Sequence, residues 1–198
     1  MKKYLIIILC FVSFNLMADP CQGVYGPYGP VQCDVGTSNA VSANGPVMME
    51  GTTVLGSTNI NGTLNAAHSV FNTLQVNGTV VLKNSIVQGE TQINGTLLAR
   101  KSWFNQPLTL ASNSVVFEDT QSVSITFLST SSSPKIFVLG GNSRVNGNIF
   151  FKDKDGVVCT SQTAQIVGNI IGGQRLVYKN ATERTQCAST GTIGLGVQ

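Results

Sequence analysis

The stretch from Ile60 to Leu98 decides the fold, because one five-residue phrase occurs in it three times. The copies are Ile60-Asn61-Gly62-Thr63-Leu64, Val76-Asn77-Gly78-Thr79-Val80 and Ile93-Asn94-Gly95-Thr96-Leu97. Their glycines stand 16 and 17 residues apart (78 − 62 and 95 − 78). Strand-forming residues on both sides of a turn, repeated at this period, predict a β-solenoid with one rung per repeat.

A longer copy joins two rungs into one unit. Residues 61–72 match residues 94–105 at an offset of 33 (94 − 61), with Gly, Thr, Leu, Ala, Ser, Phe and Asn shared in register. Helical repeat arrays have similar periods but need amphipathic helices, which no window here offers. The copy predicts inward ladders of equivalent side chains two rungs apart: Leu64 with Leu97, Ala66 with Ala99, and Phe71 with Phe104. We also expect Asn61, Asn77 and Asn94 to take the left-handed backbone conformation at the corner, with their amides bonded along the axis.

Composition agrees with stacked strands and turns. The chain has 198 residues, of which 11% are charged and 21 are glycine, against a usual charged fraction of about a quarter. This length suits one domain. Without Lys2 and Lys3, which belong to the leader described next, 10 basic residues (12 − 2) face 9 acidic ones. Such a balance offers no electrostatic basis for nucleic-acid binding.

The first 18 residues are typical of a signal peptide. Lys2 and Lys3 precede the apolar run 4–12, and Leu16-Met17-Ala18 ends in a small residue suited to cleavage. A permanent anchor is the alternative, but the run is short for a membrane span and is followed by polar residues. Lipidation of Cys10 is disfavoured because Leu9 precedes it. We expect export to the periplasm, the cell surface or the medium, from a Gram-negative bacterium, with no permanent membrane span after cleavage.

The cysteines of the mature chain indicate disulfides. Cys21 and Cys33 precede the repeats, whereas Cys159 and Cys187 follow them. Four cysteines allow three connectivities. A solenoid separates its ends, so we favour the local pairs Cys21–Cys33 and Cys159–Cys187. A zinc site is disfavoured because there is no C-x-x-C pair and His68 is the only histidine.

The repeats divide the chain into a signal peptide (1–18), an N-terminal disulfide-closed cap or loop (19–45), a β-helix (46–180) and a C-terminal segment and tail (181–198). The first cap contains the tandem turns Tyr25-Gly26-Pro27 and Tyr28-Gly29-Pro30. We interpret it as a cover for the first rung, with a binding loop that displays Tyr25 and Tyr28 as the alternative. The polar segment 129–134 is expected to leave the coil as a loop.

Few residues suggest catalysis or metal binding. Asp153-Lys154-Asp155-Gly156 resembles the start of a calcium loop, but a hairpin turn explains it better because no acidic residue follows at the required spacing. Glu118-Asp119 is the only adjacent carboxylate pair, and strand alternation would place its members on opposite faces. A groove that brought Glu118 near Arg100 or Lys101 would favour an enzyme again. We therefore predict no catalytic, cofactor-binding or metal-binding residues.

Two further residues are assigned to the surface. His68 aligns with Lys101 in the longer copy, which predicts a solvated position instead of the catalytic histidine of hexapeptide-repeat acyltransferases. Trp103 precedes Phe104, so if Phe104 points inward, Trp103 points outward. Together with Tyr25 and Tyr28, Trp103 is a candidate for surface contact.

The Asn-Gly-Thr-Leu phrases, with Gly-Asn-Ile near the end of the repeats, resemble the polymer-forming β-helix repeats of bactofilins over residues 45–173. The resemblance implies a right-handed coil and an end-to-end scaffold. The signal peptide, cysteines and caps depart from that family, so polymerisation does not carry over directly.

Together these observations predict a single-stranded right-handed parallel β-helix with about 17 residues per rung, about eight rungs and disulfide-closed ends. The expected role is that of a non-enzymatic, exported structural or surface-binding module without a cofactor. The alternatives are a secreted carbohydrate-binding or adhesive protein and, behind it, a polysaccharide-active β-helix enzyme. The expected partner is another copy of the chain, or a glycan or protein at a surface.

Overall fold

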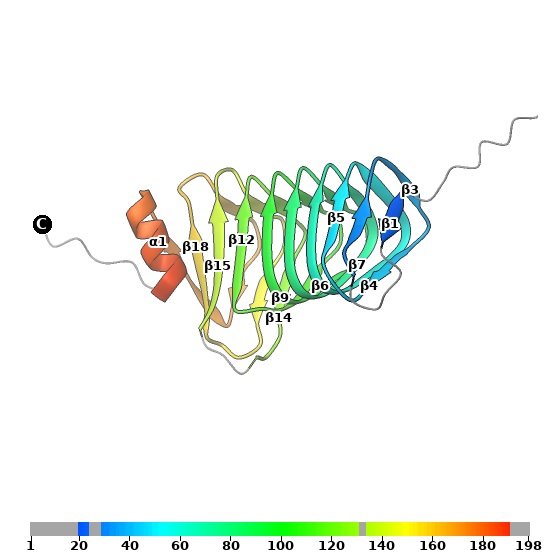
Figure 1. The fold of residues 1–198 in the computed structure, drawn as a ribbon. Coiled ribbons are helices and arrows are strands. Elements are labelled where there is room, and N and C mark those ends of the chain that lie inside the picture. The colour runs from blue at the N-terminus through cyan, green and yellow to red at the C-terminus, as the bar shows by residue number, and fades with distance from the viewer. Residues whose placement is uncertain (1–19, 24–28, 131–133, 191–198) are drawn as a thin grey trace, which may run out of the picture.

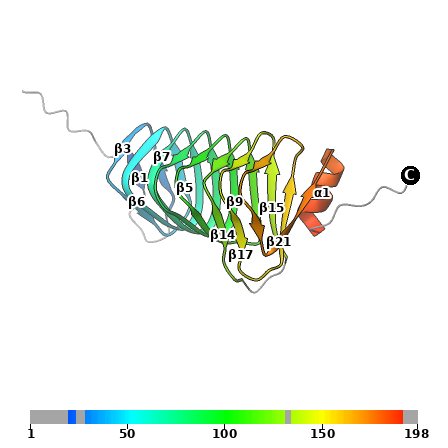
Figure 2. The same ribbon diagram turned by 180° about the vertical axis from the view of Figure 1, so that it is seen from behind.

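The computed structural model describes residues 20–23, 29–130 and 134–190. They form a parallel β-solenoid of about eight turns with a spacing of about 17 residues, as Figure 1 shows from one side and Figure 2 from behind. Every strand belongs to one continuous sheet. The predicted solenoid, its period and its number of rungs are confirmed. The signal peptide, Tyr25 and Tyr28 lie outside the described residues.

The elements are short, apart from three strands that bend around a corner without a break. In chain order they are β1 Cys21–Gly23, β2 Val31–Cys33, β3 Gly36–Ser38, β4 Val41–Ala43, β5 Val47–Glu50, β6 Thr52–Ala67, β7 Val70–Lys83, β8 Ile86–Val87, β9 Thr91–Arg100, β10 Trp103–Phe104, β11 Leu108–Ala111, β12 Ser114–Glu118, β13 Gln121–Ser122, β14 Ile125–Phe127, β15 Lys135–Gly140, β16 Arg144–Val145, β17 Ile149–Phe151, β18 Gly156–Thr160, β19 Gln165–Ile166, β20 Ile170–Ile171, β21 Gly173–Val177 and α1 Ala181–Thr190.

Each rung has three sides. Face A contains residues 58–61, 74–77 and 91–94 of β6, β7 and β9, and continues through β11, β14, β17 and β20. Face B contains β2, β5, the C-terminal halves of β6, β7 and β9, then β12, β15, β18 and β21. The short face C runs from β3 through β8 and β10 to β19.

Inward side chains stack along the axis as predicted. Leu64, Val80 and Leu97 are register partners on successive rungs, and all three are fully buried. The Ala66 to Ala99 and Phe71 to Phe104 ladders are buried as well, with Leu82 and Val87 from the rung between them. In the second half of the coil the rings of Phe127 and Phe151 stack 4.5 Å apart. The alternation of apolar and polar residues therefore decides which side chains form the core.

The corner between faces A and B differs from the prediction in one respect. The glycines and not the asparagines have positive φ, which is 153° at Gly62, 149° at Gly78 and 144° at Gly95. A Cβ on Gly78 would lie 2.0 Å from the carbonyl oxygen of Gly62, so only glycine fits. The asparagine amides do bond along the axis: Asn77 Nδ2 donates to Asn61 Oδ1 at 2.7 Å, and Asn94 Nδ2 donates to Asn77 Oδ1 at 2.6 Å.

A second corner, between faces B and C, was not predicted. Its first residue has left-handed φ on successive rungs, 64° at Gly51, 52° at His68, 48° at Asn84, 48° at Lys101 and 50° at Asp119. The next residue is a buried hydroxyl, and these residues are Thr52, Ser69, Ser85, Ser102 and Thr120. Each hydroxyl accepts a hydrogen bond from the backbone N–H of its counterpart one rung earlier. The column therefore satisfies backbone groups that the turn removes from the sheet.

This column yields a stability prediction. Ser85 Oγ accepts from Ser69 N at 3.2 Å and donates to the Lys83 carbonyl at 2.8 Å. Ser85→Ala would leave the buried Ser69 N–H without an acceptor and is expected to lower the free energy of unfolding by about 1–3 kcal/mol. Ser85→Thr is the control and is expected to cost less, because threonine occupies the column at Thr52 and Thr120. Urea denaturation compares them, and equal losses would contradict the role of the hydroxyl.

The ends of the coil differ from the expected boundaries. β2 already pairs in parallel with β5, and β3 and β4 pair with β6, so the coil begins at Val31 and not at residue 46. β1 adds an antiparallel strand against β2 and is joined to it by the Cys21–Cys33 disulfide. The second pair, Cys159–Cys187, is also as predicted. Both disulfides are local, because the rungs hold the two ends of the coil apart.

The C-terminal helix α1 was not predicted. Asn180 and Glu183 form a capping box: the Glu183 N–H donates to Asn180 Oδ1 at 2.9 Å, and Asn180 Nδ2 donates to Glu183 Oε1 at 3.1 Å. Figures 1 and 2 show α1 at the C-terminal end of the coil. It covers the outer side of face B there, and Cys187 packs in a second apolar cluster with Ile136, Val138, Val157, Cys159 and Tyr178.

Candidate functional site

The outer side of face B carries three parallel rows in its N-terminal half. Threonines next to the glycine corner form a hydroxyl row, at Thr63, Thr79 and Thr96. The middle row contains Met48, Asn65, Val81 and Leu98. The third row borders the second corner and contains Glu50, Ala67, Lys83, Arg100 and Glu118. Rungs stack at about 4.8 Å, so each row presents like groups at that spacing.

The first rungs of this face form a shallow groove of about 280 Å³. Met48 lies in it with 61% of its surface exposed. Asn65 and Val81 of the middle row line it, and Glu50 and Lys83 border it on the charged side. An exposed methionine in a groove with charged borders is typical of a contact surface.

A second hollow of about 300 Å³ adjoins the groove at Lys83. We call it the basic hollow, and its lining residues are Lys83, Asn84, Arg100, Lys101, Glu118 and Asp119. Lys83, Arg100 and Lys101 are exposed. The sequence had suggested only Arg100 and Lys101. Aligning the triplets Ala67-His68-Ser69, Lys83-Asn84-Ser85 and Arg100-Lys101-Ser102 would have added Lys83.

Glu118 and Asp119 both line the basic hollow, contrary to the expectation that they face opposite ways. The left-handed backbone at Asp119 breaks the strand alternation. Both carboxylates are turned toward the following rung. A Cβ on Gly140 would lie 2.3 Å from Glu118 Oε2, and one on Gly141 would lie 2.2 Å from Asp119 Oδ1. Glu118 therefore comes near Arg100, its register partner, while its carboxylate lies over Gly140.

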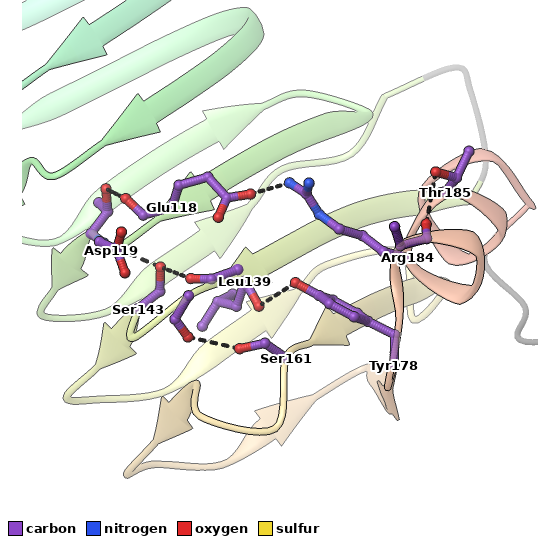
Figure 3. A network of polar contacts seen from close by, with 12 residues as sticks. Glu118, Asp119, Leu139, Ser143, Ser161, Tyr178, Arg184 and Thr185 are labelled. Carbon is purple, nitrogen blue, oxygen red and sulfur yellow. Dashed lines mark hydrogen bonds and ion pairs between the residues drawn. The ribbon is translucent and has the colours of Figure 1, made fainter.

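Figure 3 shows what holds these carboxylates. Arg184 Nη2 of α1 donates to Glu118 Oε1, and the N–H of Asn142 donates to Asp119 Oδ1 at 2.9 Å. In the same network, Tyr178 Oη donates to the Leu139 carbonyl at 3.3 Å. Burial raises the pKa of the Tyr178 hydroxyl, and the charge of Arg184 opposes the rise. The tyrosine is thus a neutral donor that fastens the C-terminal segment to face B.

A separate ionic cluster lies beside the segment 129–134. Lys135 is fully buried, and its Nζ donates to Asp153 Oδ2 at 2.5 Å and to Asp155 Oδ1 at 3.4 Å. Burial alone would lower the pKa of Lys135, but the two carboxylates outweigh it and the pKa is raised. Lys135 is therefore protonated at neutral pH and is unsuited to act as a nucleophilic amine.

The Asp153–Gly156 turn is a corner of the solenoid and not a hairpin. The flanking strands β17 and β18 pair with different neighbours, β14 and β20 for the first and β15 and β21 for the second. Its carboxylates bind Lys135. In the described part of the chain, no group of three or more His, Cys, Asp or Glu side chains is arranged to hold a metal ion.

The Lys135 cluster predicts a pH-dependent stability. The hydrogen bond from Lys135 lowers the pKa of Asp153 below 3.8, and Ser129 adds to the effect. A lowered carboxyl pKa contributes stability above the unfolded pKa, and that stability is lost as the pH falls through the folded pKa. Asp153→Asn is expected to lower the melting temperature at pH 7 and to match the wild type at pH 2. Asp155→Asn is expected to have a smaller effect, because its contact is longer. Differential scanning fluorimetry across pH checks both, and a difference that is constant with pH would contradict the assignment.

Two other residues singled out in the sequence lie on the surface. His68 is exposed, as predicted, and its Nδ1 lies 2.8 Å from Glu50 Oε1 while Asn84 Nδ2 lies 3.2 Å from its Nε2. Trp103 is 42% exposed and Phe104 is 2% exposed, so the alternation predicted for this pair is confirmed. Trp103 lies on face C and lines neither the groove nor the basic hollow.

Comparisons with known proteins leave the assignment to the geometry. No family model, curated protein or solved structure matches the chain. Among the described residues, no helix has the length and apolarity needed to span a bilayer.

Proposed function

We propose that this protein is a non-enzymatic, exported β-solenoid that acts as a surface-binding module through the open N-terminal half of face B. One observation carries the proposal. Hydroxyl, apolar and charged rows lie side by side on that half, in register over successive rungs, whereas α1 covers the other half. A row of equal groups at a constant spacing suits a ligand that is itself repetitive or extended.

Export is supported by two features of the chain. The N-terminal segment has the three parts of a signal peptide. The four cysteines among the described residues form two intramolecular disulfides, which persist in oxidising compartments such as the periplasm or the exterior.

A role without catalysis is supported by the state of the ionisable groups. Glu118 is bound by Arg184 and Asp119 by the Asn142 N–H. Lys135 is protonated and held by two carboxylates. An acid–base pair would need a group that is free to exchange a proton near neutral pH. These groups instead serve to position one another.

Glycans are the ligand class that the rows fit best. Threonine hydroxyls both donate and accept hydrogen bonds, as sugar hydroxyls do, and the apolar middle row offers contact for the less polar faces of sugar rings. The test is a glycan array probed with residues 19–198. Thr79→Val/Thr96→Val, which removes two exposed hydroxyls of face B, is expected to weaken the signals. Thr109→Val/Thr126→Val on face A is the matched control and should leave them unchanged. Equal signals from both variants would refute face B as the binding face.

An end-to-end scaffold is the second candidate, favoured by the last rung. β19, β20 and β21 pair only with the preceding strands β16, β17 and β18 among the described residues. Val167 and Val177 there are 59% and 46% exposed. Unpaired edges of this kind are templates for further strands. Electron microscopy and sizing decide between the candidates: filaments would favour the scaffold, and discrete monomers would exclude it.

A further inference from the structure

The basic hollow contains more positive charge than its surroundings balance. Lys83 and Arg100 are register partners on neighbouring rungs, and Lys101 follows Arg100 at the corner. Like charges in register on adjacent strands repel each other. Within the described residues, none of these three side chains forms an ion pair. The cations therefore face solvent together, without an internal partner.

The acids that line the hollow do not supply that partner. Glu118 lies over Gly140 and is bound by Arg184 from α1. Asp119 lies over Gly141 and accepts the Asn142 N–H. Both carboxylates are thus engaged on the C-terminal side of the hollow, away from Lys83. The fold separates the opposite charges instead of pairing them.

The backbone at Lys101 adds a second, independent observation. Its φ of 48° is left-handed, a conformation that glycine, asparagine and aspartate adopt more readily than lysine. The same corner has Gly51, Asn84 and Asp119 on other rungs. A residue that is poorly suited to its backbone but keeps a charge at a solvent-filled hollow is a sign of a binding role.

We propose that the basic hollow binds the anionic groups of an acidic polysaccharide. This inference rests on the proposed function and specifies its ligand. Arg100 would bind a carboxylate or sulfate through two parallel N–H donors, and Lys83 and Lys101 would act as point charges on either side. Thr96 and Leu98 continue outward along β9 from Arg100. Sugar rings that extend from the anchored group would therefore lie across the hydroxyl and apolar rows.

A polysaccharide fits these observations better than a nucleic acid or an anionic membrane. Only three cations gather here, on a chain whose overall basic excess is small, whereas nucleic-acid surfaces need many phosphate contacts. A membrane surface would need a broad basic patch with apolar side chains that insert into it. Face B instead offers hydroxyls at a regular spacing beside a localised charge.

The experiment uses biolayer interferometry with residues 19–198 and three immobilised polymers: polygalacturonate, dextran sulfate and uncharged dextran. The wild type is expected to prefer one or both acidic polymers, with binding that weakens as salt is added. Lys83→Gln/Arg100→Gln/Lys101→Gln is expected to weaken that binding by about tenfold or more. Asp119→Asn keeps the acceptor for Asn142 but removes a negative charge from the rim, so it is expected to strengthen binding by about two- to threefold.

The matched control is Lys152→Gln/Lys154→Gln/Lys179→Gln, which removes the same net charge from exposed lysines outside the hollow. It should bind like the wild type. Circular dichroism verifies that both triple variants fold, and Arg100→Gln alone replaces the first if it does not. Equal weakening in both triple variants, or no binding to either acidic polymer, overturns the inference. Binding to neutral glycans alone would leave the proposed function standing without it. Acidic-polymer binding that depends on the hollow but ignores Thr79→Val/Thr96→Val would instead refute the role of face B in the proposed function.

Discussion

Replacing Gly78 by alanine is expected to lower the free energy of unfolding by about 3 kcal/mol or more, a large effect for one methyl group. Gly78 has φ of 149°, and a Cβ would lie 2.0 Å from the Gly62 carbonyl oxygen of the preceding rung. That oxygen is part of the backbone, so no side-chain rotation relieves the overlap. Gly95 is stacked on Gly78 in the same way, so the displacement would pass to the next rung.

Thr79→Ala provides the control for Gly78→Ala. Thr79 is the exposed neighbour on the same corner, and its truncation is expected to change stability by no more than about 0.5 kcal/mol. Urea denaturation followed by circular dichroism compares the two variants. A Gly78→Ala protein as stable as Thr79→Ala would show that the corner relaxes freely and that the glycine repeat has another cause.

Removal of the Cys159–Cys187 disulfide is expected to have the second large effect. The bond closes a loop with a sequence separation of 28 residues, for which loop entropy predicts about 3.5 kcal/mol. It also tethers α1, a helix of 10 residues whose one buried residue is Cys187. Isolated helices of that length are marginal in water. Cys159→Ser/Cys187→Ser should therefore release α1 and expose Ile136, Val138 and Val157.

Binding of 8-anilinonaphthalene-1-sulfonate and far-ultraviolet circular dichroism measure that release. Dye fluorescence is expected to rise and helical signal to fall. Cys21→Ser/Cys33→Ser is the matched control: it removes a disulfide of sequence separation 12 that joins β1 to β2, away from the cluster under α1. It should cost somewhat less stability, about 3 kcal/mol, without the increase in dye binding. A helix that stays docked after loss of Cys159–Cys187 would show that Arg184 and Tyr178 hold it unaided.

Local chemistry explains why the coil was predictable. Each rung needs a glycine at one corner, because the backbones of successive rungs touch there, and apolar residues at alternate positions, because they face the interior. Both requirements recur at the rung period and are visible at Gly62, Gly78 and Gly95. The second corner was missed because its left-handed position holds Gly51, His68, Asn84, Lys101 and Asp119 in turn. The repeated hydroxyl after them was the available signal.

The candidate site was less predictable. Arg100, Lys101 and Glu118 had been singled out, but alternation placed Glu118 and Asp119 on opposite faces. The left-handed turn at Asp119 puts both on one hollow. Their engagement with Gly140, Gly141 and the Asn142 N–H depends on the longer step of this rung, 23 residues from Asp119 to Asn142. The 16- and 17-residue repeats do not extend to it.

The sequence by itself determined the period, the inward ladders of Leu64, Ala66 and Phe71, and the two local disulfides, because each follows from requirements that repeat within a rung or from the separation of the ends. Only the tertiary structure decided which half of face B stays open. That depends on α1 folding back so that Arg184 meets Glu118, 66 residues earlier in the chain. A single contact between distant and unrepeated residues leaves no periodic pattern, so only the folded chain shows it.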